Sequence, residues 1–208
     1  ESDPNTAAIY MGHEHEITYY YPNIGLGEVL PPDFQVTQRP WYLSAGPENN
    51  PERRVVWTPT YLDATGRGLL VTAAAPVYVN QEEFIGAVGV DVTLEDITAS
   101  IEEADVLGSG YAFLLDSEGR AVALPERGYQ DVLGRDAEPG EVGPELRETD
   151  TAFASVLDRM IEGGSGFDTL NAGGRELFVA YTPLESTGWS MANVVEADAI
   201  LEVIPTLE

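Results

Sequence analysis

The fold of this chain is decided by two consecutive stretches, Asp63-Ala-Thr-Gly-Arg-Gly-Leu-Leu-Val-Thr-Ala-Ala-Ala-Pro76 and Phe84-Ile-Gly-Ala-Val-Gly-Val-Asp-Val92. They predict a Gly-Arg turn, an apolar strand that ends at the proline, a polar turn and a last strand that carries an acid near its end. The plan returns in Asn171-Ala-Gly-Gly-Arg-Glu-Leu-Phe-Val-Ala-Tyr-Thr-Pro183 and Trp189-Ser-Met-Ala-Asn-Val-Val-Glu196. An internal repeat of this kind indicates two similar α+β modules in tandem.

The segments around the repeat fit this division. A helix is expected from Leu94 to Ala104, because Thr93 is a good N-cap and acids follow in the first turn, where the helix dipole favours them. This helix would connect the two modules, which we expect over residues 1–102 and residues 103–208. A strand pattern from Ala7 to Met11 opens the first module.

The second module begins with two expected strands between Tyr111 and Leu124, joined by a Ser-Glu-Gly turn. A long polar loop is expected from Pro125 to about Asp150. A helix then follows from Thr151 to Glu162, with Gly163 as its stop. Its apolar stripe consists of Phe153, Val156, Leu157 and Met160.

The composition describes a folded, strongly acidic protein. Hydrophobic residues make up 43% of the 208 residues, which is enough to bury a core, and the formal net charge is −26. All ten basic residues are arginines. Nucleic acids and anionic membrane surfaces are bound through clusters of Lys and Arg, so the composition excludes them as partners. The charge indicates a halophilic source, in which salt screens the self-repulsion, or an acidic exported protein from a GC-rich genome.

The chain has no cysteine, which excludes disulfides, thiolate catalysis and Cys-based metal sites. It has no run of about 20 apolar residues and no signal-peptide pattern at its start. Because it begins almost directly with a strand and stops abruptly, we expect it to be a soluble piece of a longer protein.

The candidate site starts from Arg39-Pro40-Trp41-Tyr42, an arginine among aromatic residues in a chain that is poor in cations. An arginine in this setting favours a negatively charged partner, because its planar guanidinium matches a carboxylate. Asp91, at the end of an expected strand, could hold a positive charge, and Tyr61 lies between the two in sequence. A small molecule with both charges at one end is an α-amino acid. The alternative is a turn with packed aromatics and a strand-end acid that caps the next helix.

The order of these motifs resembles double Cache sensor domains over nearly the whole chain. The first half is similar to the membrane-distal module in Tyr21-Pro-Asn23, Arg39-Pro-Trp-Tyr42, Thr58-Pro-Thr-Tyr-Leu-Asp63 and Gly89-Val-Asp-Val92. The second half is similar to the membrane-proximal module in Gly110-Tyr-Ala-Phe-Leu-Leu-Asp116 and in the run from Tyr181 to Trp189. The resemblance implies the extracytoplasmic input domain of a chemoreceptor, a sensor histidine kinase or a cyclic-dinucleotide enzyme. It also implies PAS-like modules, with a small ligand in the distal one.

The resemblance to the amino-acid-binding subgroup implies a role for each matched residue. Arg39 and Trp41 would contact the ligand carboxylate, whereas Tyr42, Tyr61 and Asp91 would contact its ammonium group. The family also implies transmembrane helices outside this piece, one of them after Glu208, and a possible homodimer in the full receptor. No cofactor and no metal are implied.

The sequence departs from the family pattern at two places. Phe34 stands where the motif has a tyrosine, so one hydrogen bond to the carboxylate would be lost, at a cost of about 0.5–1.5 kcal/mol. The helix that precedes the first strand in the family is missing, which suggests truncation. Glu196 is the counterpart of Asp91 in the second half, which has no Arg-x-Trp-Tyr motif, so we expect a structural role for it.

Two clusters near the N-terminus allow different interpretations. His13-Glu14-His15 contains the only two histidines and could ligate zinc or copper, but a solvated hairpin turn is the preferred reading. In the Tyr19-Tyr20-Tyr21 run, alternation along a strand would place at least one ring in the pocket and one outside.

The sequence does not favour an enzyme. It contains no nucleophile elbow, phosphate loop, dinucleotide fingerprint or zinc-protease motif. The pair Glu102-Glu103 could be imagined as a glycosidase dyad, but we expect it on the solvated face of the connecting helix. The alternatives to an amino-acid sensor are a sensor for a simple carboxylate or amine, and a structural surface module without ligand. The structural module would pair Asp91 directly with Arg39 and leave no cavity between them.

Overall fold

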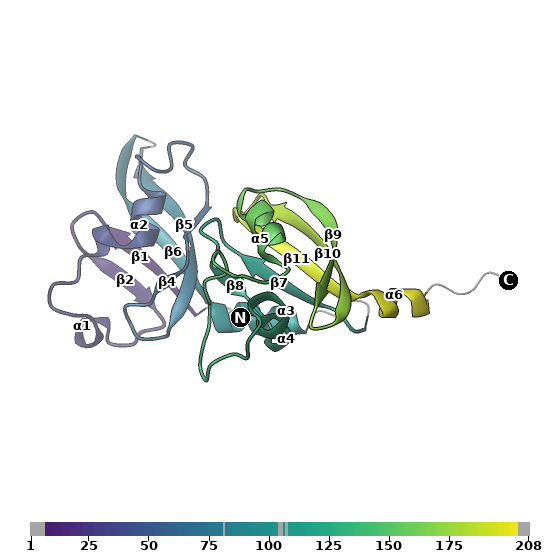
Figure 1. Cartoon of the computed structure of the whole chain (residues 1–208). Helices are drawn as coiled ribbons and strands as arrows, with labels where there is room; N and C mark the ends of the chain where they lie inside the picture. Colours follow the sequence, from purple (N-terminus) through teal and green to yellow (C-terminus); the bar gives the residue numbers. More distant parts are fainter. Residues whose placement is uncertain (1–6, 81, 104–105, 107, 204–208) are drawn as a thin grey trace. The chain divides into compact units, whose positions relative to one another are not determined.

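The computed structural model describes residues 7–80, 82–103, 106 and 108–203. The chain divides into two compact units, residues 1–93 and residues 94–208, each with its own antiparallel sheet (Figure 1). This confirms the α+β fold with two PAS-like modules. The helix α3 (Leu94–Glu102), expected from the sequence as the connector between the modules, packs against strands of the second sheet and groups with the second unit.

The first unit holds a six-stranded sheet in the order β2-β1-β6-β5-β3, with β4 paired to β5. Its long hairpin β5–β6 corresponds to the stretch that opens the sequence repeat. The elements are β1 (Ala8–His13), β2 (Thr18–Tyr21), α1 (Leu26–Val29), η1 (Val36–Gln38), α2 (Pro40–Ala45), β3 (Val56–Trp57), β4 (Tyr61–Leu62), β5 (Leu69–Val79) and β6 (Glu83–Thr93).

The second unit holds a five-stranded sheet in the order β8-β7-β11-β10-β9. In both sheets the first strand of the module lies between the second strand and the last, so the topology repeats together with the sequence. After α3, the elements are β7 (Tyr111–Leu115), β8 (Ala121–Ala123), α4 (Glu126–Gly128), η2 (Tyr129–Leu133), α5 (Ala154–Ile161), β9 (Gly166–Ala172), β10 (Arg175–Leu184), β11 (Trp189–Glu196) and α6 (Ala197–Val203).

The prolines do not end the two long strands, contrary to the expectation from the sequence. Strand β5 continues through Pro76 to Val79, and β10 includes Pro183. Pro76 faces Ala87 of β6, whereas the pairing of β3 with β5 involves only Ala73 and Ala74. A proline lacks the backbone N–H and is tolerated where a strand has no partner on that side.

The segment expected to be a polar loop from Pro125 to Asp150 contains two helical turns, α4 and η2. Tyr129 and Val132 are buried there in the core of the second unit, and this tertiary packing outweighs the weak local signal. The following helix α5 begins at Ala154 rather than Thr151, because the Thr151 hydroxyl accepts from the Phe153 N–H and donates to the Val132 carbonyl. The expected apolar stripe of this helix is fully buried.

The core of the first unit lies between its sheet and the short helix α2 (Figure 1). Pro40 occupies the first helical position, where its missing N–H costs nothing. Trp41 and Tyr42 are buried under the sheet, together with Val36 and Ala45. Among the described residues, no helix has both the length and the apolar character that crossing a bilayer requires.

Gly89 on β6 permits close packing in this core, and its replacement tests that packing. A Cβ atom there would lie 2.5 Å from Cε2 of Tyr10 and 3.0 Å from Cγ2 of Thr72. We expect Gly89→Ala to lower the free energy of unfolding by about 1–3 kcal/mol. Urea denaturation measures the change. Gly27→Ala is the control, because a Cβ at Gly27 meets no atom within 4 Å, and an equal loss in both variants would contradict the prediction.

Candidate functional site

A pocket opens in the first unit on the side of the sheet that α1 and α2 flank. The empty space at this pocket is about 370 Å³, a volume that includes open solvent at its mouth. It is lined by Tyr10, Thr18, Tyr20, Leu26, Leu30, Phe34, Val36, Arg39, Trp41, Tyr61, Asp63, Ala64, Thr65 and Asp91. Four of the five residues expected to bind ligand are among them, and Tyr42 is not.

Asp91 lies at the inner wall of the pocket, with 2% of its surface exposed. One carboxylate oxygen accepts hydrogen bonds from the Tyr10 hydroxyl and from the Thr72 hydroxyl, the latter at 2.7 Å. The other oxygen accepts from the Arg67 guanidinium at 3.0 Å. Burial raises the pKa of the Asp91 carboxyl above its ordinary value, and the hydrogen bonds from Tyr10 and Thr72 offset only part of this increase. The side chain does not cap the next helix, which was the alternative reading of this residue.

Arg67 joins two acids of the same site. Its Nε donates to Asp63 at 2.9 Å, while a terminal nitrogen reaches Asp91. Two carboxylates therefore share one guanidinium. Asp63 and Asp91 both line the pocket, so this acidic pair faces the space where a ligand would lie.

Arg39 is the arginine among the residues that line the pocket. Its guanidinium donates one hydrogen bond, of 3.1 Å, to the Leu62 carbonyl. The same group lies 5.5 Å from the ring centroid of Tyr61 and 5.8 Å from that of Phe34. No described acidic side chain lies within ion-pair distance of Arg39, and most of its donors remain available for an anion.

Trp41 and Tyr42 are neighbours on α2 but point in different directions, because successive residues of a helix are rotated by about 100°. Trp41 lines the pocket and packs edge-on against Tyr10, with ring centroids 4.7 Å apart. Tyr42 packs edge-on against Phe84 at 5.7 Å. Burial, and then the charges of Glu14 and Glu16, raise the pKa of the Tyr42 hydroxyl, which places that side chain near the β1–β2 turn.

The hydroxyls of the pocket tyrosines are donors at neutral pH. Burial and the nearby Asp91 carboxylate raise the pKa of Tyr61, whose hydroxyl lies 2.5 Å from that of Thr72. Burial also raises the pKa of Tyr20, a residue flanked by the exposed Tyr19 and Tyr21, as strand alternation predicted. The Tyr20 hydroxyl is buried. The nearby Thr65 hydroxyl lowers the pKa of Tyr20, but the Tyr20 hydroxyl has no hydrogen bond of normal geometry.

The ion pair of the first unit has a counterpart in the second. Arg175 stands at the same place in the repeat as Arg67, and it pairs with Glu196, the counterpart of Asp91, at 2.7 Å. Arg127 pairs with the same carboxylate oxygen, also at 2.7 Å. This arrangement agrees with the structural role expected for Glu196. The Gly-Arg turn of the repeat was the sequence signal that could have identified Arg67. The sequence motifs did not identify this residue, nor Tyr10, Asp63 and Thr72, as part of the site.

The chain belongs to the double Cache family, since residues 8–204 match the family described as Cache domain. It is 24% identical over 201 residues to the methyl-accepting chemotaxis protein McpC of Bacillus subtilis, which covers 97% of this chain and 26% of McpC. It is 38% identical over 112 residues to the methyl-accepting chemotaxis protein McpA of Pseudomonas putida, or 53% of this chain and 17% of McpA. The chain thus spans about a quarter or less of these relatives.

A solved structure with the same fold is the ligand-binding domain of the Pseudomonas aeruginosa amino acid chemoreceptor PctB in complex with L-Gln. The TM-score is 0.66 at 20% identity, and the alignment covers 97% of this chain and 73% of that domain. This similarity concerns the fold, because the identity is low. It agrees with the two-module architecture read from the repeat.

Proposed function

We propose that this chain is the extracytoplasmic sensor piece of a transmembrane receptor and binds an amino-acid-type ligand in its first unit. The observation that carries the proposal is the charge distribution of the pocket. Arg39 offers a guanidinium without an acidic partner among the described residues, while Asp63 and Asp91 share the single positive charge of Arg67. A zwitterion would neutralise both, and buried ions are tolerated only when they are paired.

The proposed contacts follow from the geometry. Arg39 and Trp41 would hold the carboxylate, with Tyr61 and Asp91 near the ammonium group. Tyr20 adds a hydroxyl that has no normal hydrogen bond, and leaving a buried donor unpaired costs about 1–3 kcal/mol. A ligand that accepts from this hydroxyl would remove the penalty. Tyr42 packs outside the pocket lining, and in this proposal it supports Trp41.

Two alternatives differ from this proposal in measurable ways. The structural surface module required a direct pair between Asp91 and Arg39. Asp91 pairs with Arg67 instead, and Asp91 and Arg39 both line a pocket. A sensor for a simple carboxylate has more support, because Arg67, Tyr10 and Thr72 already occupy the Asp91 oxygens. In that case Arg39 alone would select the ligand.

Calorimetric titration with three matched sets of ligands tests the function. The sets are the amino acids, their deaminated carboxylates and their decarboxylated amines, and each is measured in molar salt. We expect amino acids to bind and both analogue sets to bind more weakly. Binding of the carboxylates alone would support the alternative sensor, and the absence of any binding or thermal shift would refute the ligand proposal.

Phe34 provides a prediction about affinity. It lines the pocket beside Arg39, at the place where the family motif has a hydroxyl. We expect Phe34→Tyr to tighten amino-acid binding by about 0.5–1.5 kcal/mol, or roughly 2- to 12-fold in Kd. Titration of both proteins with one amino acid measures the difference. Phe178→Tyr, in the second unit, is the control, and equal affinities for Phe34→Tyr and the unmodified protein would contradict the prediction.

The remaining parts of the receptor are proposals too. The relatives named above are chemoreceptors, so we favour a chemotaxis output over a sensor histidine kinase, with no catalytic activity in this piece. Transmembrane helices outside the piece would provide its membrane attachment, and a homodimer would form in the full receptor.

A halophilic source would follow from the charge of −26, because salt screens the repulsion between the acidic groups. A melting temperature that does not rise between dilute and molar salt would argue against a halophilic source.

A further inference from the structure

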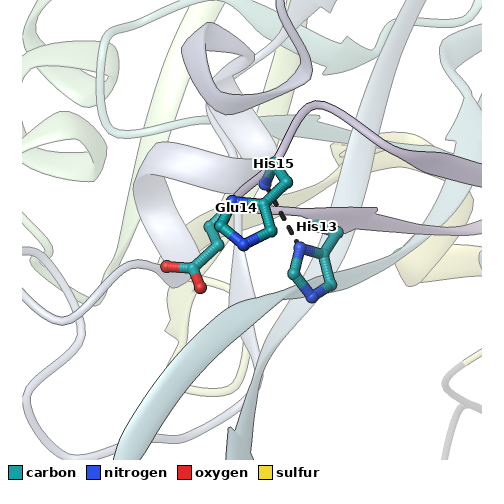
Figure 2. A group of neighbouring side chains, drawn as sticks. All are labelled: His13, Glu14 and His15. Atoms are coloured by element: carbon teal, nitrogen blue, oxygen red, sulfur yellow. Dashed lines mark hydrogen bonds between the residues drawn. The ribbon is translucent and has the colours of Figure 1, made fainter.

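We propose that the turn between β1 and β2 binds a divalent transition-metal ion through His13, Glu14 and His15. Each of the three side chains offers one ligand atom, and these atoms lie within 4.8 Å of one another. The two imidazole ring centroids are 5.0 Å apart, and Figure 2 shows the three side chains at the turn. This site is separate from the pocket, whose lining contains none of these residues.

The backbone of the turn explains why the three side chains converge. In a continuous strand, Glu14 would point away from the two histidines. Strand β1 ends at His13, however, and Glu16 has a left-handed φ of 61°, so the chain reverses before β2 begins at Thr18. The His13 N–H donates to the Ile17 carbonyl at 2.8 Å and closes the turn. The reversal brings Glu14 to the histidines.

The turn is also held in place by the rest of the unit. The Glu14 N–H donates to the Ile85 carbonyl of β6 at 3.0 Å. The Glu16 carboxylate accepts from the Val36 N–H at 2.7 Å and from the Thr37 hydroxyl. Ligands on a fixed backbone lose less freedom when an ion binds.

The ligand types select the class of ion. Two imidazole nitrogens and one carboxylate oxygen suit Zn²⁺, Ni²⁺ or Cu²⁺, whereas Mg²⁺ and Ca²⁺ prefer oxygen ligands alone. Three protein ligands leave a fourth position for water. Because Zn–N bonds are about 2.0–2.1 Å long, the exposed side chains would close around the ion by rotation. The His15 backbone N–H donates a hydrogen bond of 3.2 Å to His13 Nδ1, and such a rotation would affect this bond.

The surroundings favour a cation at this turn. Both histidines of the chain lie here, in a protein with a formal charge of −26, and such a field raises the local concentration of cations. Glu14 and His15 are exposed and His13 is partly exposed, so an ion reaches the ligands directly from solvent. Acidic side chains elsewhere on the surface lack a neighbouring imidazole, which separates this turn from nonspecific binding.

Calorimetric titration of the untagged chain with ZnCl₂, and separately with NiCl₂, tests the site. We expect one equivalent of Zn²⁺ to bind with an affinity that falls about tenfold or more in His13→Ala and in His15→Ala, and falls measurably in Glu14→Gln. Excess MgCl₂ should not compete. Glu48→Gln, which changes an exposed acid elsewhere in the same unit, should bind like the unmodified protein.

Two results would overturn the site. The first is the absence of stoichiometric Zn²⁺ or Ni²⁺ binding by the unmodified chain. The second is unchanged binding in the double variant His13→Ala/His15→Ala, which would assign the ion to scattered acidic groups. Circular dichroism of each variant shows whether it is folded. If it is not, His13→Asn and His15→Asn replace the alanine variants, because asparagine is readily accommodated in turns.

Discussion

Replacement of Arg39 by alanine should abolish most of the ligand affinity while the protein remains folded. Arg39 is the pocket cation without an acidic partner among the described residues, so the ligand carboxylate would lose its counter-charge. Truncating one member of a desolvated charge pair costs about 2–5 kcal/mol, which corresponds to about 30-fold or more in Kd. Calorimetric titration with an amino acid that binds the unmodified chain measures the loss.

Two further variants make the Arg39 experiment specific. Arg54→Ala removes the same charge from the same unit, but the Arg54 side chain is 72% exposed and lies outside the pocket lining, so its affinity should not change. Arg39→Lys keeps the charge and loses the planar fork, so we expect an intermediate loss. Equal binding by Arg39→Ala and Arg54→Ala would exclude Arg39 as the carboxylate partner.

Replacement of Asp91 by alanine should have the largest effect on stability. The change leaves Arg67, Tyr10 and Thr72 without their shared acceptor in a buried wall of the pocket. Breaking a buried ion pair by removing one partner costs about 3–5 kcal/mol. We expect the lower end, because Arg67 is partly exposed and regains water. Urea denaturation, with the slope compared between variants, measures the free energy of unfolding.

The sequence repeat offers a matched control for Asp91. Glu196 occupies the corresponding position and also forms ion pairs with arginines. Its side chain is 35% exposed, however, and its partners Arg127 and Arg175 are more exposed than Arg67. Glu196→Ala should therefore cost about 1 kcal/mol or less. Losses of similar size in the two variants would show that burial does not distinguish the two ion pairs.

Asp91→Asn separates the structural role of Asp91 from its role in ligand binding. Asparagine retains an acceptor for Tyr10 and Thr72 but removes the negative charge. We expect this variant to lose affinity for amino acids and to retain more of its affinity for the deaminated carboxylates. Unchanged affinity for amino acids would place the ammonium group away from Asp91.

The limits of sequence reasoning are visible in Tyr42 and Arg67. Tyr42 belongs to the recognised motif, yet the rotation between successive helical residues directs it toward Phe84 rather than into the pocket. Arg67 lies in the repeated turn and was read only as an entry to a hairpin. Its pairing with Asp91 joins the turn before β5 to strand β6, and no local pattern specifies which acid a guanidinium will reach.

The strand lengths also depend partly on local sequence signals and partly on tertiary packing. Alternation and turn residues placed the long hairpins of both modules, because those signals are local and act within a few residues. They did not predict that β5 would continue past Pro76, since that depends on which strand lies beside it. The helical turns of α4 and η2 also escaped prediction, because their formation depends on the burial of Tyr129 and Val132 in a core assembled from distant segments.

The sequence by itself determined the two-module α+β fold, the acidic surface and the presence of Arg39, Trp41, Tyr61 and Asp91 as candidate ligand contacts, because periodicity, charge and motif order are local properties. Only the tertiary structure decided which of these side chains line one pocket. It also assigned Arg67 to Asp91 and left Arg39 without an acidic partner among the described residues. The physical reason is that a charge is balanced by its neighbours in space, and those neighbours come from strands far apart in the chain.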